Sequence, residues 1–122
     1  MDEKHEQLMA DHLALIWNQH DEMLRLKAIQ SIYASDIVMY DMEDEVLHGH
    51  QAVNQKVTSL LSSFPAGHSI NQIKPSVYQN NVGKLEWGVG LKGAEPILTG
   101  TDIVFFEDGK VKSFYVFVNG AE

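Results

Sequence analysis

ILTGTDIVFFEDGKVKSFYVFV, residues 97–118, is the stretch that decides the fold. Its two arms, residues 97–106 and 110–118, are rich in Val, Ile and Phe, which favour β-strands. Glu107-Asp108-Gly109 joins the arms and is a tight hairpin signal, because glycine adopts a positive φ without strain. Both faces of the two predicted strands are apolar. One face must therefore be covered by helices, and the other must meet a cavity, a partner subunit or both.

Upstream of this hairpin the chain keeps the pattern of strands. Residues 82–91 alternate apolar and polar or small side chains, and Asn80-Asn81 ahead of them is a turn signal. Residues 69–79 predict another strand, interrupted at Pro75 because proline cannot donate to a sheet ladder. The second half of the chain therefore predicts a four-stranded antiparallel meander.

The first half of the chain predicts three helices and a short β pair. Apolar residues recur there at helical spacing, Asp21 is a good N-cap, and Pro65 is a stop signal. The predicted helices cover residues 5–19, 22–34 and 50–63, and the predicted strands cover residues 36–41 and 46–48. A length of 122 residues fits a single domain spanning 1–122.

Composition and charge narrow the possible partners. The formal net charge is −8, and so acidic a surface repels phosphate backbones, which argues against nucleic acid. No apolar run approaches the roughly 20 residues that cross a bilayer, and the first residues do not form a signal peptide, so we expect no membrane. The chain has no cysteine, which suits a cytoplasmic protein.

Two aspartates stand within the apolar strand segments. Asp41 closes Ile37-Val38-Met39-Tyr40-Asp41, and Asp102 opens Asp102-Ile103-Val104-Phe105-Phe106. A carboxylate is costly to bury unless it is paired, hydrogen-bonded or protonated. Each aspartate therefore has a catalytic interpretation and a plainer one. Asp41 begins an acidic run that could be a solvated loop, and Asp102 could be a strand-end carboxylate bonded to a backbone amide or a tyrosine hydroxyl.

In their order and spacing, four segments resemble the nuclear transport factor 2-like superfamily, which includes SnoaL-like polyketide cyclases and ketosteroid isomerases. The segments are Trp17–Asp21, Tyr33–Asp36, Gly49 with Ala52, and Phe105–Val111. The resemblance spans nearly the whole chain. It implies a cystatin-like α+β fold, a cone-shaped barrel in which a curved, mostly antiparallel sheet packs on three helices around a deep apolar pocket. One such fold hosts many activities.

The similarity to ketosteroid isomerase reaches individual residues. Residues 34–41 align without gaps with the segment that carries the general base of that enzyme, and the base falls on Asp41. Asp102 aligns with its second aspartate, a neutral acid that donates a hydrogen bond to the developing oxyanion. The tyrosine that assists falls on Leu13, which cannot donate, and this separates the chain from the steroid isomerase reaction itself.

Aromatic and apolar residues could form the wall of the implied pocket, although each one singly could equally pack in the core. The candidate ligand-binding residues are Trp17, Tyr33, Tyr40, Trp87, Val104, Phe106 and Tyr115. Tyr33, Tyr40 or Tyr115 could supply the hydroxyl that Leu13 lacks, and no spacing argument chooses among them.

The histidines do not predict a metal site. His48 and His50, with acidic neighbours, have a spacing that hints at a metal, but Gly49 places them at a strand–helix junction where they cannot share a helix face. His12 is expected to be a partly buried helix residue. We expect no metal and no nucleotide.

Two functions lead from the sequence, and a stress- or hydrolase-like protein of the same fold is a third. The first is a SnoaL-like protein that binds a small apolar or cyclic molecule and possesses cofactor-free acid–base chemistry next to a carbonyl, as an isomerase, cyclase or dehydratase. Asp41 would then abstract the proton and Asp102 would stabilise the enolate oxygen. The second is a non-catalytic module of the same fold that binds a ligand or dimerises. A homodimer through the exposed sheet face is expected in either case.

Overall fold

The computed structural model describes residues 3–120. Its seven strands form one curved, open sheet in the order β2-β1-β7-β6-β5-β3, with β4 paired to another part of β5. All neighbours are antiparallel except β1 and β7, which run parallel. The strands are β1 (Tyr33–Tyr40), β2 (Val46–His48), β3 (Ser69–Gln72), β4 (Val77–Gln79), β5 (Val82–Gly90), β6 (Leu98–Glu107) and β7 (Lys110–Val118). The helices are α1 (Glu3–Asp11), η1 (His12–Trp17), α2 (Glu22–Ile32) and α3 (Gly49–Ser63).

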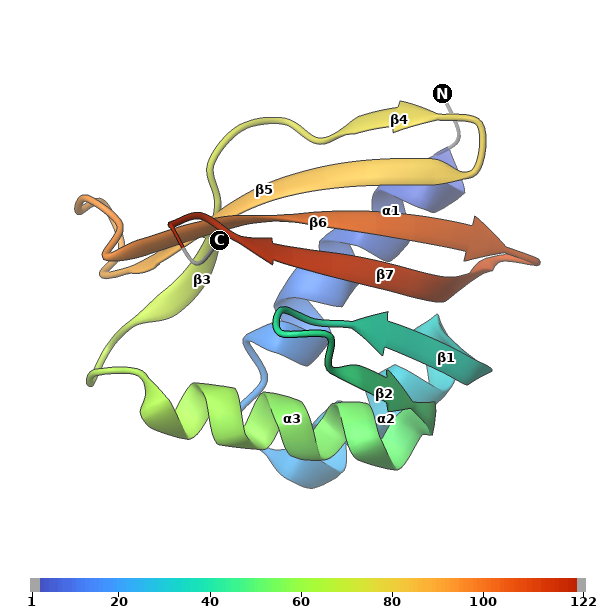
Figure 1. Ribbon diagram of the computed structural model, residues 1–122, viewed down its shortest axis with the longest axis horizontal. Helices are drawn as coiled ribbons and strands as arrows, with labels where there is room; N and C mark the ends of the chain where they lie inside the picture. Colours follow the sequence, from blue (N-terminus) through green and yellow to red (C-terminus); the bar gives the residue numbers. More distant parts are fainter. Residues whose placement is uncertain (1–2, 121–122) are drawn as a thin grey trace.

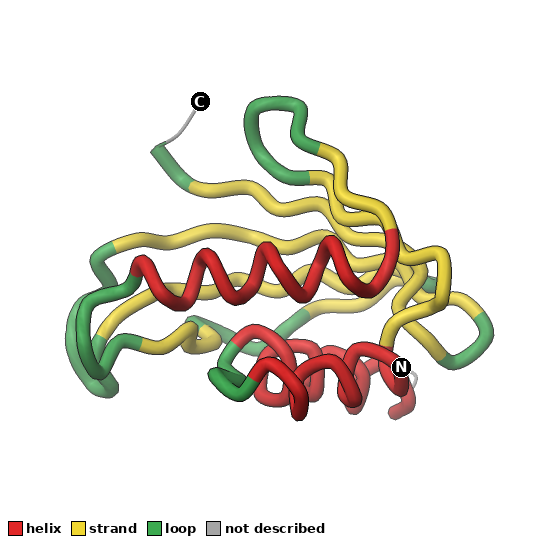
Figure 2. Tube along the Cα trace, turned by 90° about the horizontal axis from the view of Figure 1, so that it is seen from below, coloured by secondary structure: helices red, strands yellow, loops and turns green. Residues whose placement is uncertain are grey.

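The helical segments lie on one side of the sheet, as the α+β prediction requires (Figures 1 and 2). The side chains that alternate toward them are buried, including Ile37 and Met39 of β1 and Val104 and Phe106 of β6. The shared face that the sequence predicts for Asp102, Val104 and Phe106 is confirmed by this alternating burial. No helix in the described residues is long and apolar enough to cross a membrane.

The C-terminal hairpin forms as the sequence predicts. Glu107 pairs with Lys110, so Asp108 and Gly109 make a two-residue loop, with φ of 53° and 75°. Positive φ at both positions is the conformation that matches the twist of adjoining strands. The predicted strand 69–79 is interrupted around Pro75, and its two ends, β3 and β4, pair with different parts of β5.

The first helix differs from a regular α-helix at its C-terminal end. α1 continues without a break into η1, a π-helix that ends two residues before the predicted boundary. The backbone N–H of Asn18 donates to the carbonyl of Leu13 at 3.0 Å, a bond spanning five residues. The Asn18 side chain also bonds the backbone N–H and carbonyl of Ile70, at 2.8 and 2.7 Å. These two bonds tie the end of the helix to β3 and hold the wide turn in place.

The second helix begins as predicted and ends earlier. The side chain of Asp21 accepts the backbone N–H groups of Met23 and Leu24, both at 3.0 Å, which confirms the N-cap. The helix ends at Ile32, two residues before the predicted boundary, because Tyr33 already pairs with Val111 of β7.

A buried arginine fixes α3 against α2. Arg25 is 1% exposed and donates to the side chains of Asn54, at 2.5 Å, and Thr58, and to the backbone carbonyl of Gln19 at 2.6 Å. Asn54 and Thr58 stand on either side of Lys56 in the sequence of α3. The arginine therefore sets the position of the helix segment that carries this lysine.

Candidate functional site

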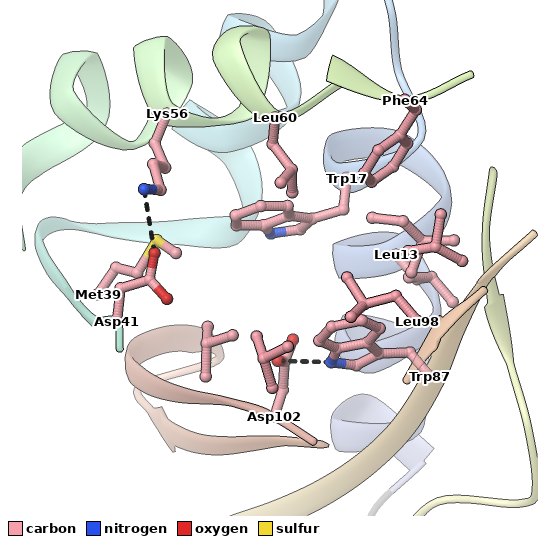
Figure 3. A pocket seen from close by; sticks show the side chains of 14 residues that line it. Leu13, Trp17, Met39, Asp41, Lys56, Leu60, Phe64, Trp87, Leu98 and Asp102 are labelled. Atoms are coloured by element: carbon pink, nitrogen blue, oxygen red, sulfur yellow. Dashed lines mark hydrogen bonds and ion pairs between the residues drawn. The ribbon is translucent and has the colours of Figure 1, made fainter. Parts of the chain in front are cut away.

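A cavity of about 150 Å³ lies between the sheet and the helices, and Figure 3 shows its walls. Most of its lining is apolar, and three of the lining residues are charged. The lining residues are Leu13, Trp17, Met39, Asp41, Lys56, Leu60, Phe64, Ile70, Trp87, Val89, Leu98, Asp102, Val116 and Val118. Both aspartates singled out in the sequence border this one cavity, together with a lysine that the sequence did not single out.

Asp102 is held by two ring N–H groups from different elements. Its Oδ1 accepts from Nε1 of Trp87 on β5 at 2.9 Å, and its Oδ2 lies 3.0 Å from Nε2 of His12 on η1. Only 7% of the residue is exposed. A carboxylate at this depth is stabilised by hydrogen bonds that favour its ionised form.

Trp17 and Tyr33 determine which nitrogen of His12 donates a hydrogen bond and which accepts one. The indole N–H of Trp17 can only donate, and it donates to the hydroxyl oxygen of Tyr33 at 3.0 Å. The Tyr33 hydroxyl in turn lies 2.6 Å from Nδ1 of His12, so its proton is directed to that nitrogen. A neutral His12 then carries its own proton on Nε2 and donates it to Asp102.

The state of Tyr33 supports this direction. Its side chain is fully buried, and burial raises the pKa of the hydroxyl well above its usual range. The hydroxyl therefore keeps its proton and remains a donor. A chain of hydrogen bonds, each with one donor and one acceptor, thus runs from Trp17 through Tyr33 and His12 to the Asp102 carboxylate.

This arrangement differs from the one that the ketosteroid isomerase resemblance implies for Asp102. A protonated Asp102 that donated to Nε2 of His12 would force the His12 proton onto Nδ1. The Tyr33 hydroxyl would then lose its acceptor in a fully buried position, at a cost of about 1–3 kcal/mol. The geometry therefore favours an ionised Asp102 that accepts hydrogen bonds.

Asp41 lies directly after β1 and is engaged by a cation. Its Oδ2 lies 3.2 Å from Nζ of Lys56 on α3, and its Oδ1 accepts the backbone N–H of Met42 at 2.8 Å. The same Nζ lies 2.8 Å from Oε1 of Glu45. The acidic run after β1 is thus partly neutralised by one lysine that also borders the cavity.

Strand register sets the spacing of the two aspartates. Val116 lies on β7, the strand between β1 and β6. On one side of it, Tyr40 pairs with Tyr115, so the next residue, Asp41, lies beside Val116. On the other side, Asp102 pairs with Val116. Two strand spacings separate their backbone positions, which is about 10 Å. The carboxylates therefore do not share a proton, and a small molecule can lie between them.

The structure places the predicted wall residues in three different environments. Trp17 and Trp87 line the cavity. Tyr33, Val104 and Phe106 are buried outside it; Tyr33 acts behind His12, and Phe106 stacks on His5 with ring centroids 4.3 Å apart. Tyr40 and Tyr115 stack on each other on the outer face of the sheet, with centroids 4.3 Å apart.

Strand alternation explains the outward position of the two tyrosines. Tyr40 alternates with Met39 and Asp41, and Tyr115 stands between Phe114, which is buried, and Val116, which lines the cavity. The hydroxyl that Leu13 lacks is therefore not supplied at the cavity by Tyr40 or Tyr115. Leu13 itself is part of the cavity wall.

His12 and Lys56 are the functional candidates that the sequence analysis missed. His12 is fully buried, not partly buried as expected, because it pairs with Asp102. No local signal marks it, since its partner lies on β6. Lys56 interrupts the helical stripe of Val53, Val57 and Leu60. A lysine within an apolar stripe is the signal that could have indicated a charged residue at the cavity.

His50, one of the two histidines whose spacing hints at a metal, contacts backbone carbonyls. His50 Nε2 lies 3.2 and 3.0 Å from the backbone carbonyls of Tyr33 and Ala34. Among residues 3–120, no three His, Cys, Asp or Glu side chains are grouped as metal ligands.

Comparison with known proteins identifies the fold. No protein-family model and no curated protein matches the sequence. Among solved structures, a proposed isomerase of the SnoaL-like family from Agrobacterium tumefaciens is 19% identical, covers 98% of this chain and 100% of its own, and has a TM-score of 0.85. A proposed ketosteroid isomerase from Kribbella flavida is 13% identical over 98% of this chain and 81% of its own, with a TM-score of 0.74. A proposed SnoaL-like polyketide cyclase from Jannaschia is 8% identical over 97% and 87%, with a TM-score of 0.78.

The chain has the nuclear transport factor 2-like fold. At these identities, similarity to structures of this fold establishes architecture and leaves activity to be argued from the cavity. The fold predicted from the sequence is thereby confirmed, with an open sheet around the helices.

Proposed function

We propose that this protein binds a small apolar or cyclic carbonyl compound and transfers a proton at the carbon next to the carbonyl without a cofactor. The observation that carries the proposal is the Asp102 carboxylate, which borders an apolar cavity and is oriented by His12 and Trp87. Isomerisation, cyclisation and dehydration all begin with such a proton transfer.

Asp102 is the better general base of the two aspartates. Both oxygens of Asp41 are already engaged, one by the Lys56 ammonium and one by a backbone N–H. Asp102 likewise accepts one hydrogen bond on each oxygen, but from the ring N–H groups of His12 and Trp87 and not from an ammonium. A nearby cation favours the charged form of a carboxylate, so the carboxylate without one is better suited to take a proton. This moves the role of base from Asp41, where the ketosteroid isomerase resemblance places it, to Asp102.

The proposed step is balanced within the site. Asp102 takes the proton from the α-carbon, the C–H electron pair becomes the enolate, and negative charge moves from the carboxylate to the substrate oxygen. Returning the proton to another carbon completes an isomerisation. His12 acts as a positioning residue, because its Nε2–H orients Asp102 while the Tyr33 hydroxyl fixes its tautomer.

The solved structures lend support at the level of reaction class. The neighbours include proteins described as a SnoaL-like isomerase, a ketosteroid isomerase and a polyketide cyclase. Isomerisation and cyclisation are among the reactions that the proposal considers, and the present cavity offers a carboxylate suited to the proton transfer with which they begin.

The test is exchange of α-hydrogens for deuterium in small ketones, followed by NMR in D2O. We expect Asp102→Ala to abolish protein-catalysed exchange, because a positioned base is worth on the order of 10²–10⁴ in rate. Asp41→Asn should retain exchange, because Asp102 and not Asp41 is the proposed base. The matched control is Asp36→Asn, which breaks the ion pair of an aspartate with Lys112 outside the cavity and should leave exchange unchanged. Equal exchange by the wild type and Asp102→Ala refutes the assigned role.

A second candidate, a non-catalytic ligand-binding module, is favoured by one observation. The chain from Trp17 to Asp102 satisfies each of its N–H and O–H groups, as a purely structural network would. In that case the wild type binds ketones but shows no α-hydrogen exchange above the buffer rate.

A further inference from the structure

Lys56 is the one charged cavity residue to which the proton transfer assigns no task. It stands on α3 beside Asp41, and Figure 3 shows the pair on the side of the cavity away from Trp87. The size of the cavity, the donors of this ammonium and the local charge together restrict what can bind there.

The volume of the cavity limits its occupant to about one ring. A closed apolar cavity of about 150 Å³ in a protein interior accommodates benzene. The present cavity has about this volume, so a four-ring steroid cannot be enclosed in it. The part of a ligand that reaches Asp102 is therefore a single ring or a short chain.

The Lys56 ammonium has one donor to spare. It carries three N–H groups, and within the described residues it contacts two carboxylates, Asp41 at 3.2 Å and Glu45 at 2.8 Å. The third N–H is available to an oxygen in the cavity that Lys56 borders.

Lys56 acts as a cation and not as a nucleophile. The hydrogen bond that Lys56 donates to Glu45 raises the pKa of its ammonium above the ordinary lysine value, against the opposing effect of burial, and Asp41 raises this pKa further. The amine therefore remains protonated and does not form a Schiff base. A protonated amine can instead stabilise an oxygen on which negative charge develops.

The surrounding charges select a neutral ligand. Asp41, Glu45 and Asp102 contribute three carboxylates around a single ammonium, so a ligand that arrives with its own carboxylate is repelled. A neutral carbonyl meets no such repulsion. During the reaction the charge on its oxygen appears only as Asp102 becomes neutral.

We infer that the substrate is a neutral carbonyl compound whose reacting part is a single ring or a short chain and whose oxygen is bound by the Lys56 ammonium, with Asp41 and Glu45 as the residues that position the lysine. The inference rests on the proposed function for the role of Asp102, and it adds the substrate class and the group that receives the enolate charge. No bond to Lys56 is made or broken, and its proton stays on nitrogen.

Three probes of similar ring size separate the effects of the carbonyl oxygen, the ring shape and the ligand charge on binding. Cyclohexanone has the acceptor oxygen, methylenecyclohexane has the same shape without it, and cyclohexanecarboxylate carries a charge. Dissociation constants are measured by NMR titration of the cavity methyl groups. We expect the wild type to bind cyclohexanone about tenfold more tightly than methylenecyclohexane, which is the size of a single hydrogen bond to a charged donor. Cyclohexanecarboxylate should bind most weakly.

Lys56→Met removes the ammonium and keeps the apolar stem. In this variant the two uncharged probes should bind equally, and the infrared carbonyl band of bound cyclohexanone should lose its shift to lower frequency. Binding of methylenecyclohexane shows that the cavity remains folded. Lys112→Met, which breaks a lysine–aspartate ion pair away from the cavity, should retain the tenfold preference.

The outcomes separate this inference from the proposed function. A tenfold preference that persists in Lys56→Met overturns the inference, as does tighter binding of cyclohexanecarboxylate or no binding of any probe. A preference that depends on Lys56, in a wild type without α-hydrogen exchange, upholds the binding role and overturns the catalytic proposal. Exchange that Asp102→Ala abolishes and Lys56→Met leaves unchanged upholds the catalytic proposal and overturns the role of Lys56.

Discussion

Trp87 lies directly opposite Gly100 across the β5–β6 ladder, and its indole ring covers the glycine Cα. A methyl group added at Gly100 would overlap Cζ2 of this ring and the backbone carbonyl of Phe117. The absence of a side chain at Gly100 therefore lets the indole lie flat, with its N–H on Asp102 at 2.9 Å. A glycine inside a strand often marks such a close approach.

Gly100→Ala should displace Trp87. We expect the free energy of unfolding to fall by about 1–3 kcal/mol, as in other overpacked sites. The NMR signal of the Trp87 indole N–H should also shift upfield, because its bond to the carboxylate is lost. Thr101→Ala, at the outward-facing neighbour, is the control and should leave that signal in place. An unshifted signal in Gly100→Ala would show that the ring does not depend on the glycine.

Asp102→Asn should be destabilising although it preserves shape. The Asn amide would direct its NH2 at one of two N–H donors, Trp87 Nε1 or His12 Nε2. Reversing the His12 tautomer removes the conflict but leaves the Tyr33 hydroxyl without an acceptor. We expect a loss of about 1–3 kcal/mol in urea unfolding. Nitrogen-15 NMR should find the His12 proton on Nε2 in the wild type and on Nδ1 in the variant; the same tautomer in both would contradict the assigned hydrogen-bond directions.

Stability at alkaline pH should depend on Tyr33. Burial raises the pKa of its hydroxyl well above the value near 10 that it has in the unfolded chain. Above about pH 10 the unfolded chain releases this proton while the folded protein holds it, so the free energy of unfolding falls as pH rises. Tyr33→Phe should be less stable at neutral pH by about 1–3 kcal/mol, because Trp17 and His12 lose their partner.

The free energies of unfolding of the wild type and Tyr33→Phe should then approach each other above about pH 10. Their difference should shrink by up to about 1.4 kcal/mol for each pH unit. Urea unfolding at a series of pH values measures it. A difference that stays constant across this range would contradict the raised pKa.

The sequence predicts the elements well because their signals are local. The order of helices and strands, the Asp21 cap and the Asp108-Gly109 turn all follow from residues close in the chain. The C-terminal ends of the first two helices were each predicted two residues too late, for non-local reasons. Tyr33 fits the helical stripe before it but joins the sheet through Val111, and the π-helix depends on the contact of Asn18 with Ile70.

The candidate site was predictable in part for the same reason. Asp41 and Asp102 stand out because one directly follows an apolar strand and the other lies within one. The partner of Asp102 comes from a helix 90 positions away, so its acceptor role cannot be inferred from neighbours in the sequence. The outward positions of Tyr40 and Tyr115 follow from alternation alone and could have been predicted.

A homodimer is expected from the sequence, and the outer face of the sheet is the surface through which it would form. Tyr40 and Tyr115 stack there, Phe105 packs on the edge of Tyr115 with centroids 6.0 Å apart, and Phe117 is 50% exposed. Contiguous aromatic surface of this kind is unusual on a monomer. We propose that a second copy of the chain covers it.

Phe117→Asp should then convert a dimer into a monomer in sedimentation equilibrium, because a charge buried at an interface without a partner costs several kcal/mol. Cyclohexanone binding should survive, since Phe117 points away from the cavity that its neighbours Val116 and Val118 line. Met23→Asp, at a side chain 70% exposed on α2, is the control and should remain dimeric. A wild type that sediments as a monomer at millimolar concentration would refute the dimer, and the exposed aromatic residues would then need another explanation.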